Sequence, residues 1–444
     1  MHNFRRFCLG VAGVSLLVLI YGLITTDISY WQPASLGLAV STAIGIGAIN
    51  SLKSYQYTAW IIAAVVAGMM YPTAFLKWGE VDLRDKWLIL VVVQLVMFGM
   101  GIQMSLKDFK GLGSTGKGII IGLLCHFSIM PLMGFLLVNI FHFETEIAAG
   151  IILIGSCSSG LASNVMVYIA RANLVLSVAV TAMATLIAPF MTPLLMKLLA
   201  GTLIEIKFFN MMMEIVKIVI VPIGAAFVHD YLKGASIKNF NKLKVIAGAC
   251  AVWLLALSLG LWTGLELILS ENAMSSVEIF SFFAGALIVG LLYHLLAAKF
   301  PKIDDIMPYF SMFGIVYFTT VTTAAGRDNL LNVGFILFLA SVIHNGAGYL
   351  FGYLLSRLFG LDKKSSRTVA FEVGLQNGGM ASGLAGSMGK LGTVGLAAAV
   401  FSPWMNISGS ILANYWRKQA LKEEAEEEKR GSFVIQNDGE GFKE

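Results

Sequence analysis

The strongest constraint in this 444-residue sequence is a series of long apolar runs separated by short polar loops. A helix that crosses a bilayer needs roughly 17–25 mostly apolar residues, and the chain is 57% hydrophobic and only 13% charged. These features predict an all-α polytopic membrane protein and exclude a soluble enzyme of the usual kind, a disordered chain and a nucleic-acid-binding domain. We predict about fourteen transmembrane helices, at 8–24, 34–50, 58–76, 87–104, 118–141, 147–170, 174–200, 211–229, 246–269, 277–298, 307–325, 332–355, 368–390 and 393–414.

The basic residues predict the orientation of these spans. Lys and Arg number 31, and they lie almost entirely between the apolar runs. If the N-terminus is cytoplasmic and the C-terminal tail is left out of the count, seventeen loop cations lie inside and seven outside. Such an excess of Lys and Arg in the cytoplasmic loops sets the orientation of membrane proteins. We expect an integral protein of the plasma (inner) membrane with both termini cytoplasmic. The first run is expected to stay as a helix rather than be cleaved as a signal peptide, and residues 417–444 to form a charged cytoplasmic tail.

Motifs for common enzyme chemistry are missing from the sequence. It contains no HExxH zinc motif, no GxxxxGK[ST] phosphate loop and no GxSxG nucleophile motif. The four cysteines lie within apolar runs without metal-ligand spacing, which indicates buried thiols: Cys8, Cys125, Cys157 and Cys250. The sequence therefore predicts neither an enzyme nor a protein with a bound cofactor.

Two of the predicted spans carry unusual polar residues. Residues 155–173 place four serines and Asn164 among apolar residues and glycines, and residues 371–392 contain Glu372, Gln376, Asn377 and seven glycines. Glycine costs about 1 kcal/mol per helical position relative to alanine, and unpaired polar side chains in hydrocarbon cost more. A broken helix that lines a cavity explains both segments, because its freed carbonyl groups and helix ends can bind ions.

Glu372 is the one acidic residue well inside a predicted span. An ionisable group there costs at least a few kcal/mol unless it is paired, and a bound cation would be an economical partner. The alternative is a glutamate that reaches the interface near a helix end, since Arg367 precedes it by five residues. Because the polar residues Gln376 and Asn377 closely follow Glu372 in the sequence, we favour the interpretation that Glu372 is an ion ligand.

The two polar segments also resemble each other. Asn164 is followed by Pro189 after 25 residues, and Asn377 by Pro403 after 26. Each segment follows a helix in which a histidine, His126 or His344, precedes a glycine by eight residues. Weak internal symmetry with broken helices at matching positions is typical of inverted-repeat secondary transporters, which bind substrate and ions near the membrane midplane.

These motifs together resemble the bile acid–sodium symporter family. The similarity is carried by SNVMVYIARANLVLSVAVTAMATLIAPFMTP (163–193), HNGAGYLFGYLL (344–355) and FEVGLQNGGMASGLA (371–385). The resemblance implies two inverted five-helix repeats, with two crossing broken helices in a core domain beside a panel domain. It predicts two extra helices in 1–57, the first repeat in 58–200, and the second repeat in 211–416 with an inserted helix pair at 246–298.

The resemblance also implies two sodium sites. The first would be formed by hydroxyl, amide and carboxylate oxygens, on Ser163, Asn164, Ser177, Thr181 and Glu372. The second would use Glu372, Gln376, the backbone carbonyls of Val373 and Leu375, and His126, where the family usually has glutamine. Since imidazole offers nitrogen and protonates near pH 6.5, this second site is either weaker, absent or replaced by proton coupling. The alternative is that His126 is a core histidine hydrogen-bonded to a neighbouring group.

The same resemblance implies an organic anion as substrate. Half-helix N-termini favour an anion, and the expected contacts are Asn377 and Asn406, although Met405 replaces a histidine common in the family. We therefore predict a sodium-coupled symporter of a bile-acid-like anion or a small carboxylate, working by alternating access. A proton-coupled transporter is the main alternative, and a sensor or intramembrane enzyme is less favoured. Na⁺, the anion and the lipid bilayer are the expected partners, nucleic acid is not, and the oligomeric state stays open.

Overall fold

The computed structural model describes residues 2–49, 52–105 and 112–440. Its only strands in that part of the chain are β1 (Lys77–Trp78) and β2 (Val81–Asp82), an antiparallel pair that joins Lys77 to Asp82. The α-helices are α1 (His2–Ile24), α2 (Ile28–Gly45), α3 (Gln56–Met70), α4 (Lys86–Ile102), α5 (Leu112–Phe141), α6 (Thr145–Ser156), α7 (Leu161–Ile169), α8 (Leu174–Leu199), α9 (Phe208–Ile215), α10 (Val221–Lys233), α11 (Ile237–Ala256), α12 (Trp262–Glu266), α13 (Glu271–Lys299), α14 (Ile303–Ala325), α15 (Arg327–Leu358), α16 (Lys363–Gly374), α17 (Gly378–Ser387) and α18 (Leu396–Glu440).

The helices follow the predicted spans. Eight helices among the described residues are long and apolar enough to cross a membrane, and each contains most of one predicted span. The other six predicted spans lie on α2, α3, α4, α14 and two interrupted pairs, α6–α7 and α16–α17. The chain is thus an all-α integral membrane protein, while the number of fourteen crossings remains a prediction.

Both polar segments contain a break between two helices, as their composition predicts. The first changes from helix to extended chain after Ser156 and becomes helical again at Leu161. The second does so between Gly374 and Gly378, where the Asn377 Oδ1 accepts a hydrogen bond of 2.9 Å from the Met380 N–H and caps α17. Each break therefore produces a half-helix that begins in the interior of the protein.

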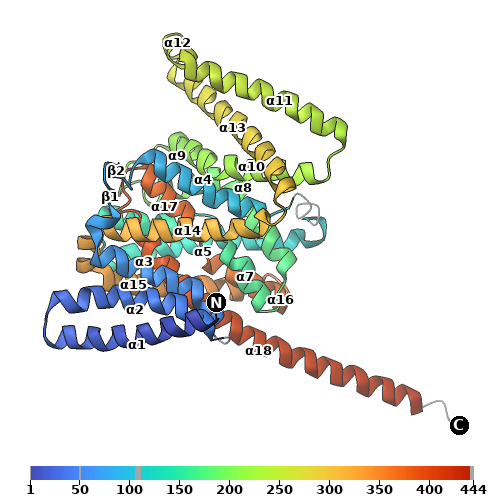
Figure 1. Ribbon diagram of the computed structural model, residues 1–444. Helices are drawn as coiled ribbons and strands as arrows, with labels where there is room; N and C mark the ends of the chain where they lie inside the picture. The colour runs from blue at the N-terminus through green and yellow to red at the C-terminus, as the bar shows by residue number, and fades with distance from the viewer. Residues whose placement is uncertain (1, 50–51, 106–111, 441–444) are drawn as a thin grey trace.

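A helical body surrounds these breaks (Figure 1). The largest buried cluster joins α4 to α5–α8 and α15–α18, and α17 packs against α4, α14 and α18. The α1–α2 hairpin packs on α3 along one side of the body. The interrupted helices consequently lie among other helices, where lipid does not reach the unpaired backbone groups of the breaks.

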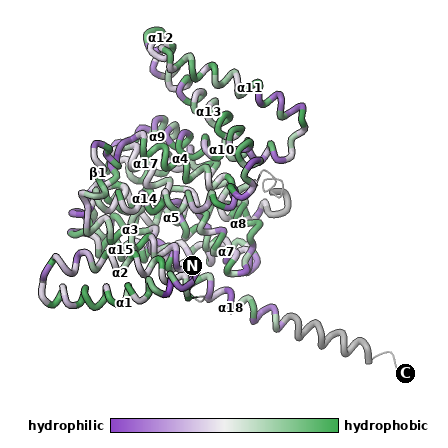
Figure 2. Tube along the Cα trace, in the orientation of Figure 1, coloured by the Kyte–Doolittle hydropathy of each residue, from purple (hydrophilic) through white to green (hydrophobic). Residues whose placement is uncertain are grey.

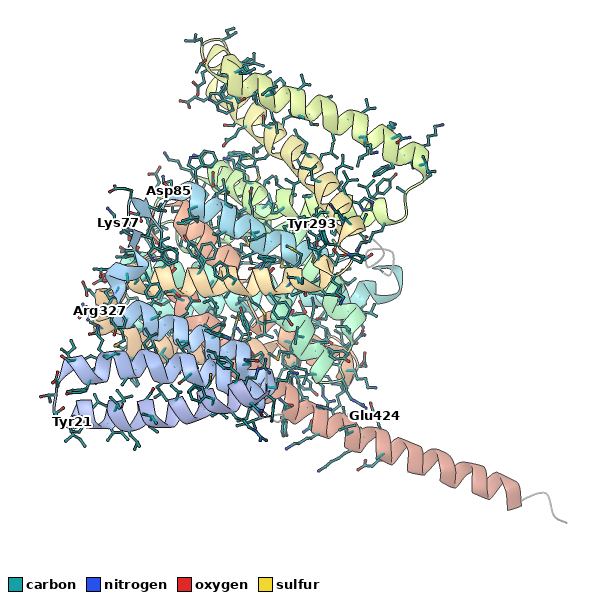
Figure 3. All side chains as sticks on the ribbon, viewed as in Figure 1. Tyr21, Lys77, Asp85, Tyr293, Arg327 and Glu424 are labelled. Carbon is teal, nitrogen blue, oxygen red and sulfur yellow. The ribbon has the colours of Figure 1, made fainter. Side chains whose placement is uncertain are left out.

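The inserted helices form an arm that stands away from the body (Figure 1). The arm consists of α11, α12 and α13, and it meets the body where Tyr293 lies (Figure 3). Its helices are hydrophobic along most of their length, with hydrophilic residues where α11 begins (Figure 2). A π-helical turn at Leu257–Leu261 interrupts the arm, with Gly260 at a φ of 112° that glycine tolerates better than other residues.

The C-terminal helix continues beyond its apolar part. α18 begins at Leu396 and runs to Glu440, past the composition change near residue 415, and projects from the body with Glu424 on it (Figure 3). Glu424 pairs with Arg171, at the end of α7. Glu423 pairs with Lys363 and with the buried Arg367, both on α16. The start of the charged tail thus connects the ends of both interrupted helices.

Candidate functional site

The two breaks lie against each other and satisfy each other's backbone groups. The Gly160 N–H donates to the Leu375 carbonyl at 3.1 Å, and the Asn377 N–H donates to the Ser158 carbonyl at 2.8 Å. Ser159 and Gln376 form an isolated antiparallel bridge between these bonds. Such mutual pairing lets extended backbone exist at the centre of a membrane protein. It also brings side chains separated by more than 200 residues into one cluster.

The Glu372 carboxylate lies at the centre of this cluster. It is fully buried, and its oxygens accept hydrogen bonds from Ser177 at 2.5 Å, Ser159 at 2.7 Å and Thr181 at 2.8 Å. No Lys, Arg or His among the described residues forms an ion pair with it. Among the residues that the structure describes, this buried carboxylate is therefore held by neutral donors alone and has no positively charged partner.

The other residues predicted for the first sodium site lie around the same carboxylate. The Asn164 Oδ1 lies 2.7 Å from the Ser177 hydroxyl oxygen and 3.3 Å from that of Thr181. The Ser163 and Thr181 hydroxyl oxygens are 3.4 Å apart. The structure thus brings together all five residues of that set, from α7, α8 and α16. Oxygens of this kind suit a hard cation, whereas no group of three His, Cys, Asp or Glu side chains within the described ranges is arranged to hold a metal ion.

Ser159 belongs to the cluster but was not among the residues predicted for it. Its segment contains Ser156, Ser158, Ser159 and Ser163, and all four are buried. Only the extended backbone after Ser156 decides which hydroxyl reaches Glu372, and helical spacing does not predict that direction. The serine-rich composition was the available signal, and it could not rank the individual serines.

The residues of the second predicted set are close together but already have protein partners. The His126 ring nitrogens lie 2.9 Å from the Glu372 carbonyl oxygen and 2.8 Å from that of Cys157. The Val373 carbonyl accepts a bond of 2.6 Å from the Gln376 Nε2, and the Leu375 carbonyl accepts from Gly160. The Gln376 Oε1 is buried and has no hydrogen-bond partner among the described residues, so it can accept a bond from a ligand or ion.

The predicted substrate residues, Asn377 and Asn406, both line one cavity beside the crossing. Its volume is about 290 Å³, and helices α3, α4, α7, α14 and α18 contribute to its walls. Within the described ranges, the hydrogen-bond acceptors of the Asn377 Nδ2 are two sulfur atoms, those of Met97 at 3.9 Å and Met100 at 4.0 Å, and a thioether is a weak acceptor. A strong oxygen acceptor from a ligand would thus improve the hydrogen bonding of this buried amide.

These features define an integral membrane protein with two interrupted helices whose breaks pair beside a buried carboxylate. A family model described as the Sodium Bile acid symporter family matches residues 90–271. A Bacillus subtilis (strain 168) protein named uncharacterized sodium-dependent transporter YocS is 32% identical over 381 residues, which cover 85% of this chain and 95% of that protein. This chain belongs to the sodium bile acid symporter family, whose members are transporters and not enzymes.

Two further relatives come from eukaryotes. A probable sodium/metabolite cotransporter of Arabidopsis thaliana chloroplasts, BASS1, is 30% identical over 84% of this chain and 76% of its own length. The human ileal sodium/bile acid cotransporter is 29% identical over 65% of each chain. The substrates in these names differ, so the family alone does not define the molecule that this chain transports.

Proposed function

We propose that this protein is a sodium-coupled symporter of an organic anion in the plasma membrane, with both termini in the cytoplasm. The observation that carries the proposal is the buried Glu372 carboxylate, whose partners in the described part of the chain are all neutral groups. A buried charge without a partner is expensive in a membrane protein. One sodium ion would neutralise it, and the names of the relatives describe sodium-dependent transport.

The proposed coupling site contains the five residues of the first set together with Ser159. A hydroxyl group has one donor and two acceptor lone pairs. Without the ion the hydroxyls of Ser159, Ser177 and Thr181 donate to Glu372. When sodium binds, rotation of the same hydroxyls directs their lone pairs to the cation, and the Asn164 Oδ1 and Glu372 complete the shell. The ion thereby connects α7, α8 and α16.

A cation at the second set would have to share carbonyl oxygens that already accept hydrogen bonds. The carbonyl oxygens of Val373 and Leu375 accept bonds from protein donors, and His126 lies between two carbonyl groups. The Gln376 Oε1 is the exception, because it has no partner among the described residues. We therefore propose that any second sodium binds at His126, Glu372, Val373, Leu375 and Gln376 more weakly than the first.

The proposed substrate site is the 290 Å³ cavity beside the crossing. No charged side chain lines it within the described part of the chain, so an anion would be recognised by amides and by the half-helix N-termini at Leu161 and Gly378. Cavities for drug-sized ligands measure about 300–1,000 Å³. A volume of 290 Å³ favours a small carboxylate over a steroid.

Alternating access would move a core against a panel. The core would comprise α5–α8 and α15–α18, and the panel α3, α4, α9, α10 and α14, which keeps the predicted repeats at 58–200 and 211–416. The cavity lies between these groups of helices. Sodium would fix the crossing, and the ordered crossing would then present Asn377 and Asn406 to the substrate.

His126 keeps proton coupling as the second candidate. Both its ring nitrogens face carbonyl acceptors. A neutral imidazole has a single N–H and can donate to one of these carbonyls, whereas a protonated ring would donate to both. Uptake measured across pH at a fixed sodium gradient separates the two candidates. A sodium symporter keeps its requirement for sodium at every pH, and a proton-coupled transporter works under a pH gradient without sodium.

The purified protein offers a direct test of substrate and ion together. A thermal-shift screen of organic anions is run in sodium and in potassium, with small carboxylates and bile acids as separate groups. Since a ligand stabilises the state that it binds, we expect stabilisation by a small carboxylate only when sodium is present. Equal stabilisation in potassium would contradict sodium coupling.

Replacement of Asn377 by serine tests the substrate site. Serine keeps an oxygen that caps α17 but lacks the Nδ2 donor, so Asn377→Ser should raise KM for uptake about tenfold, as expected for a lost hydrogen bond to a charged group. Sodium binding should be unchanged. Asn139→Ser, at an exposed residue whose amide bonds its own helix, is the matched control, and an unchanged KM in Asn377→Ser refutes the contact.

A further inference from the structure

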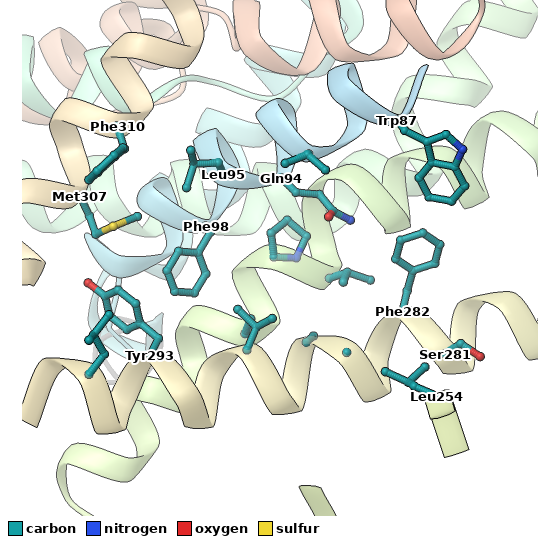
Figure 4. A pocket seen from close by; sticks show the side chains of 18 of the residues that line it. Trp87, Gln94, Leu95, Phe98, Leu254, Ser281, Phe282, Tyr293, Met307 and Phe310 are labelled. Atoms are coloured by element: carbon teal, nitrogen blue, oxygen red, sulfur yellow. The ribbon is translucent and has the colours of Figure 1, made fainter. Parts of the chain in front are cut away.

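A second and larger cavity lies on the other side of α4 (Figure 4). It has a volume of about 980 Å³ and lies between α4, α10, α13 and α14, with contributions from α11 and α12. The arm therefore supplies one of its walls. Gln94, Leu95 and Phe98 of α4 face this cavity, whereas Val96 and Met97 face the cavity at the crossing. Helix α4 is a shared wall between the two.

One end of this cavity carries ionisable groups within predicted spans. The Lys217 Nζ pairs with the Glu278 Oε1 at 2.8 Å and the Glu214 Oε1 at 3.0 Å, and Glu278 lines the cavity. One ammonium and two carboxylates leave one negative charge. Glu214 and Glu278 lie near the starts of their predicted spans and are 35% and 39% exposed, so a ligand in the cavity can reach this cluster.

The backbone is irregular at the same place. Residues Val216–Ile220 form a π-helical turn, a feature that is frequent at functional sites. The Lys217 carbonyl accepts a hydrogen bond of 3.0 Å from the Nε2 of Gln94, which also lines the cavity. Trp87 and Phe282 line this end as well, and the Lys217 Nζ lies 5.8 Å from the Phe282 ring centroid. Carboxylates beside aromatic faces form a suitable site for an ammonium group.

The rest of the cavity is apolar and elongated. Along α13 its lining extends from Phe282 to Leu296, which at 1.5 Å per residue is roughly 21 Å. Gly285 lies on this wall, and a Cβ atom there would meet no other atom within 4 Å. The whole wall belongs to the candidate membrane span Ala273–Lys299. Its dimensions and its place in the span suit the acyl chains of a lipid.

We propose that this cavity binds a phospholipid with an ammonium head group. The ammonium group pairs with Glu278, the head group lies in the leaflet where α13 begins, and the acyl chains follow α13 towards Tyr293 and Leu296. Two acidic groups against one basic group favour this lipid over an anionic one. The site does not depend on the transported substrate or its coupling ion, and the lipid contacts the α4 wall that the crossing cavity also uses.

Lipid retention by the purified full-length protein tests the proposal. The protein is equilibrated with equal amounts of phosphatidylethanolamine and phosphatidylglycerol of identical acyl chains, and bound lipid is counted by native mass spectrometry. We expect about tenfold preference for phosphatidylethanolamine, which corresponds to one charge-assisted hydrogen bond. Glu278→Gln should remove this preference. Glu271→Gln, an exposed position two turns earlier on α13, should keep it.

A second variant tests the apolar part without changing any charge. Gly285→Leu fills open space in the cavity and should lower retention of both lipids, while Gly248→Leu, on α11 where a Cβ also meets nothing within 4 Å, should not. Equal retention of the two lipids by wild type overturns the head-group assignment. Unchanged retention in Gly285→Leu, or dimers of the chain in place of bound lipid, overturns the site.

Discussion

Glu372→Gln should abolish sodium-driven uptake. Glutamine has nearly the shape of glutamate and can still bond Ser159, Ser177 and Thr181, but it carries no charge to balance a cation. A buried charge left without its partner costs about 3–5 kcal/mol, so we expect sodium affinity and uptake at moderate sodium to fall at least about a hundredfold. Uptake of the anion into proteoliposomes under a sodium gradient measures the effect.

The control for this variant is another glutamate that lacks a buried environment. Glu205 precedes α9, and its side chain is 80% exposed, so Glu205→Gln should transport like wild type. Thermal unfolding of Glu372→Gln without sodium should remain cooperative, since the neighbouring hydroxyls can rotate to donate to the amide oxygen or to accept from its NH2 group. Wild-type uptake by Glu372→Gln at low sodium would refute the proposed site.

Gly383→Leu should nearly stop transport while the protein still binds sodium. α17 presents Gly379, Gly383 and Gly386 to α4, and a Cβ on Gly383 would lie 2.6 Å from the Val93 Cγ2. A leucine there separates α17 of the proposed core from α4 of the proposed panel, and overpacking of this kind costs about 1–3 kcal/mol. The conformation described here would be disfavoured, and we expect uptake to fall about tenfold or more.

This second prediction also has a matched control. Gly346 lies on α15, and a Cβ there would meet nothing within 4 Å, so Gly346→Leu adds the same volume without a clash. Sodium binding should persist in both variants, because neither glycine contacts the Glu372 cluster. If Gly383→Leu transports at the wild-type rate, the contact between α17 and α4 plays no part in the transport cycle.

The centre of the site was largely predictable from local sequence. Glycine and polar residues in two apolar segments predicted two breaks, and the breaks occur after Ser156 and after Gly374. Glu372 was predictable because a carboxylate in an apolar run is costly whatever surrounds it. Asn164, Ser177 and Thr181 followed from resemblance to the family, and the structure places them around the carboxylate.

Other features depend on contacts between distant segments. Ser159 reaches Glu372 because its backbone is paired with Gln376, which spacing within one segment does not reveal. The cavity beside the arm requires α4, α13 and α14 to be placed relative to one another. The start of the charged tail is paired with earlier segments, because Arg171, Lys363 and Arg367 form ion pairs with Glu423 and Glu424.

The central claim is that the cluster around Glu372 binds sodium, and equilibrium binding of radioactive sodium to the purified protein tests it most directly. We predict saturable binding to wild type that excess potassium does not displace, with binding lost in Glu372→Gln and weakened in Ser159→Ala. No saturable binding to wild type, or equal binding by wild type and Glu372→Gln, would contradict the claim.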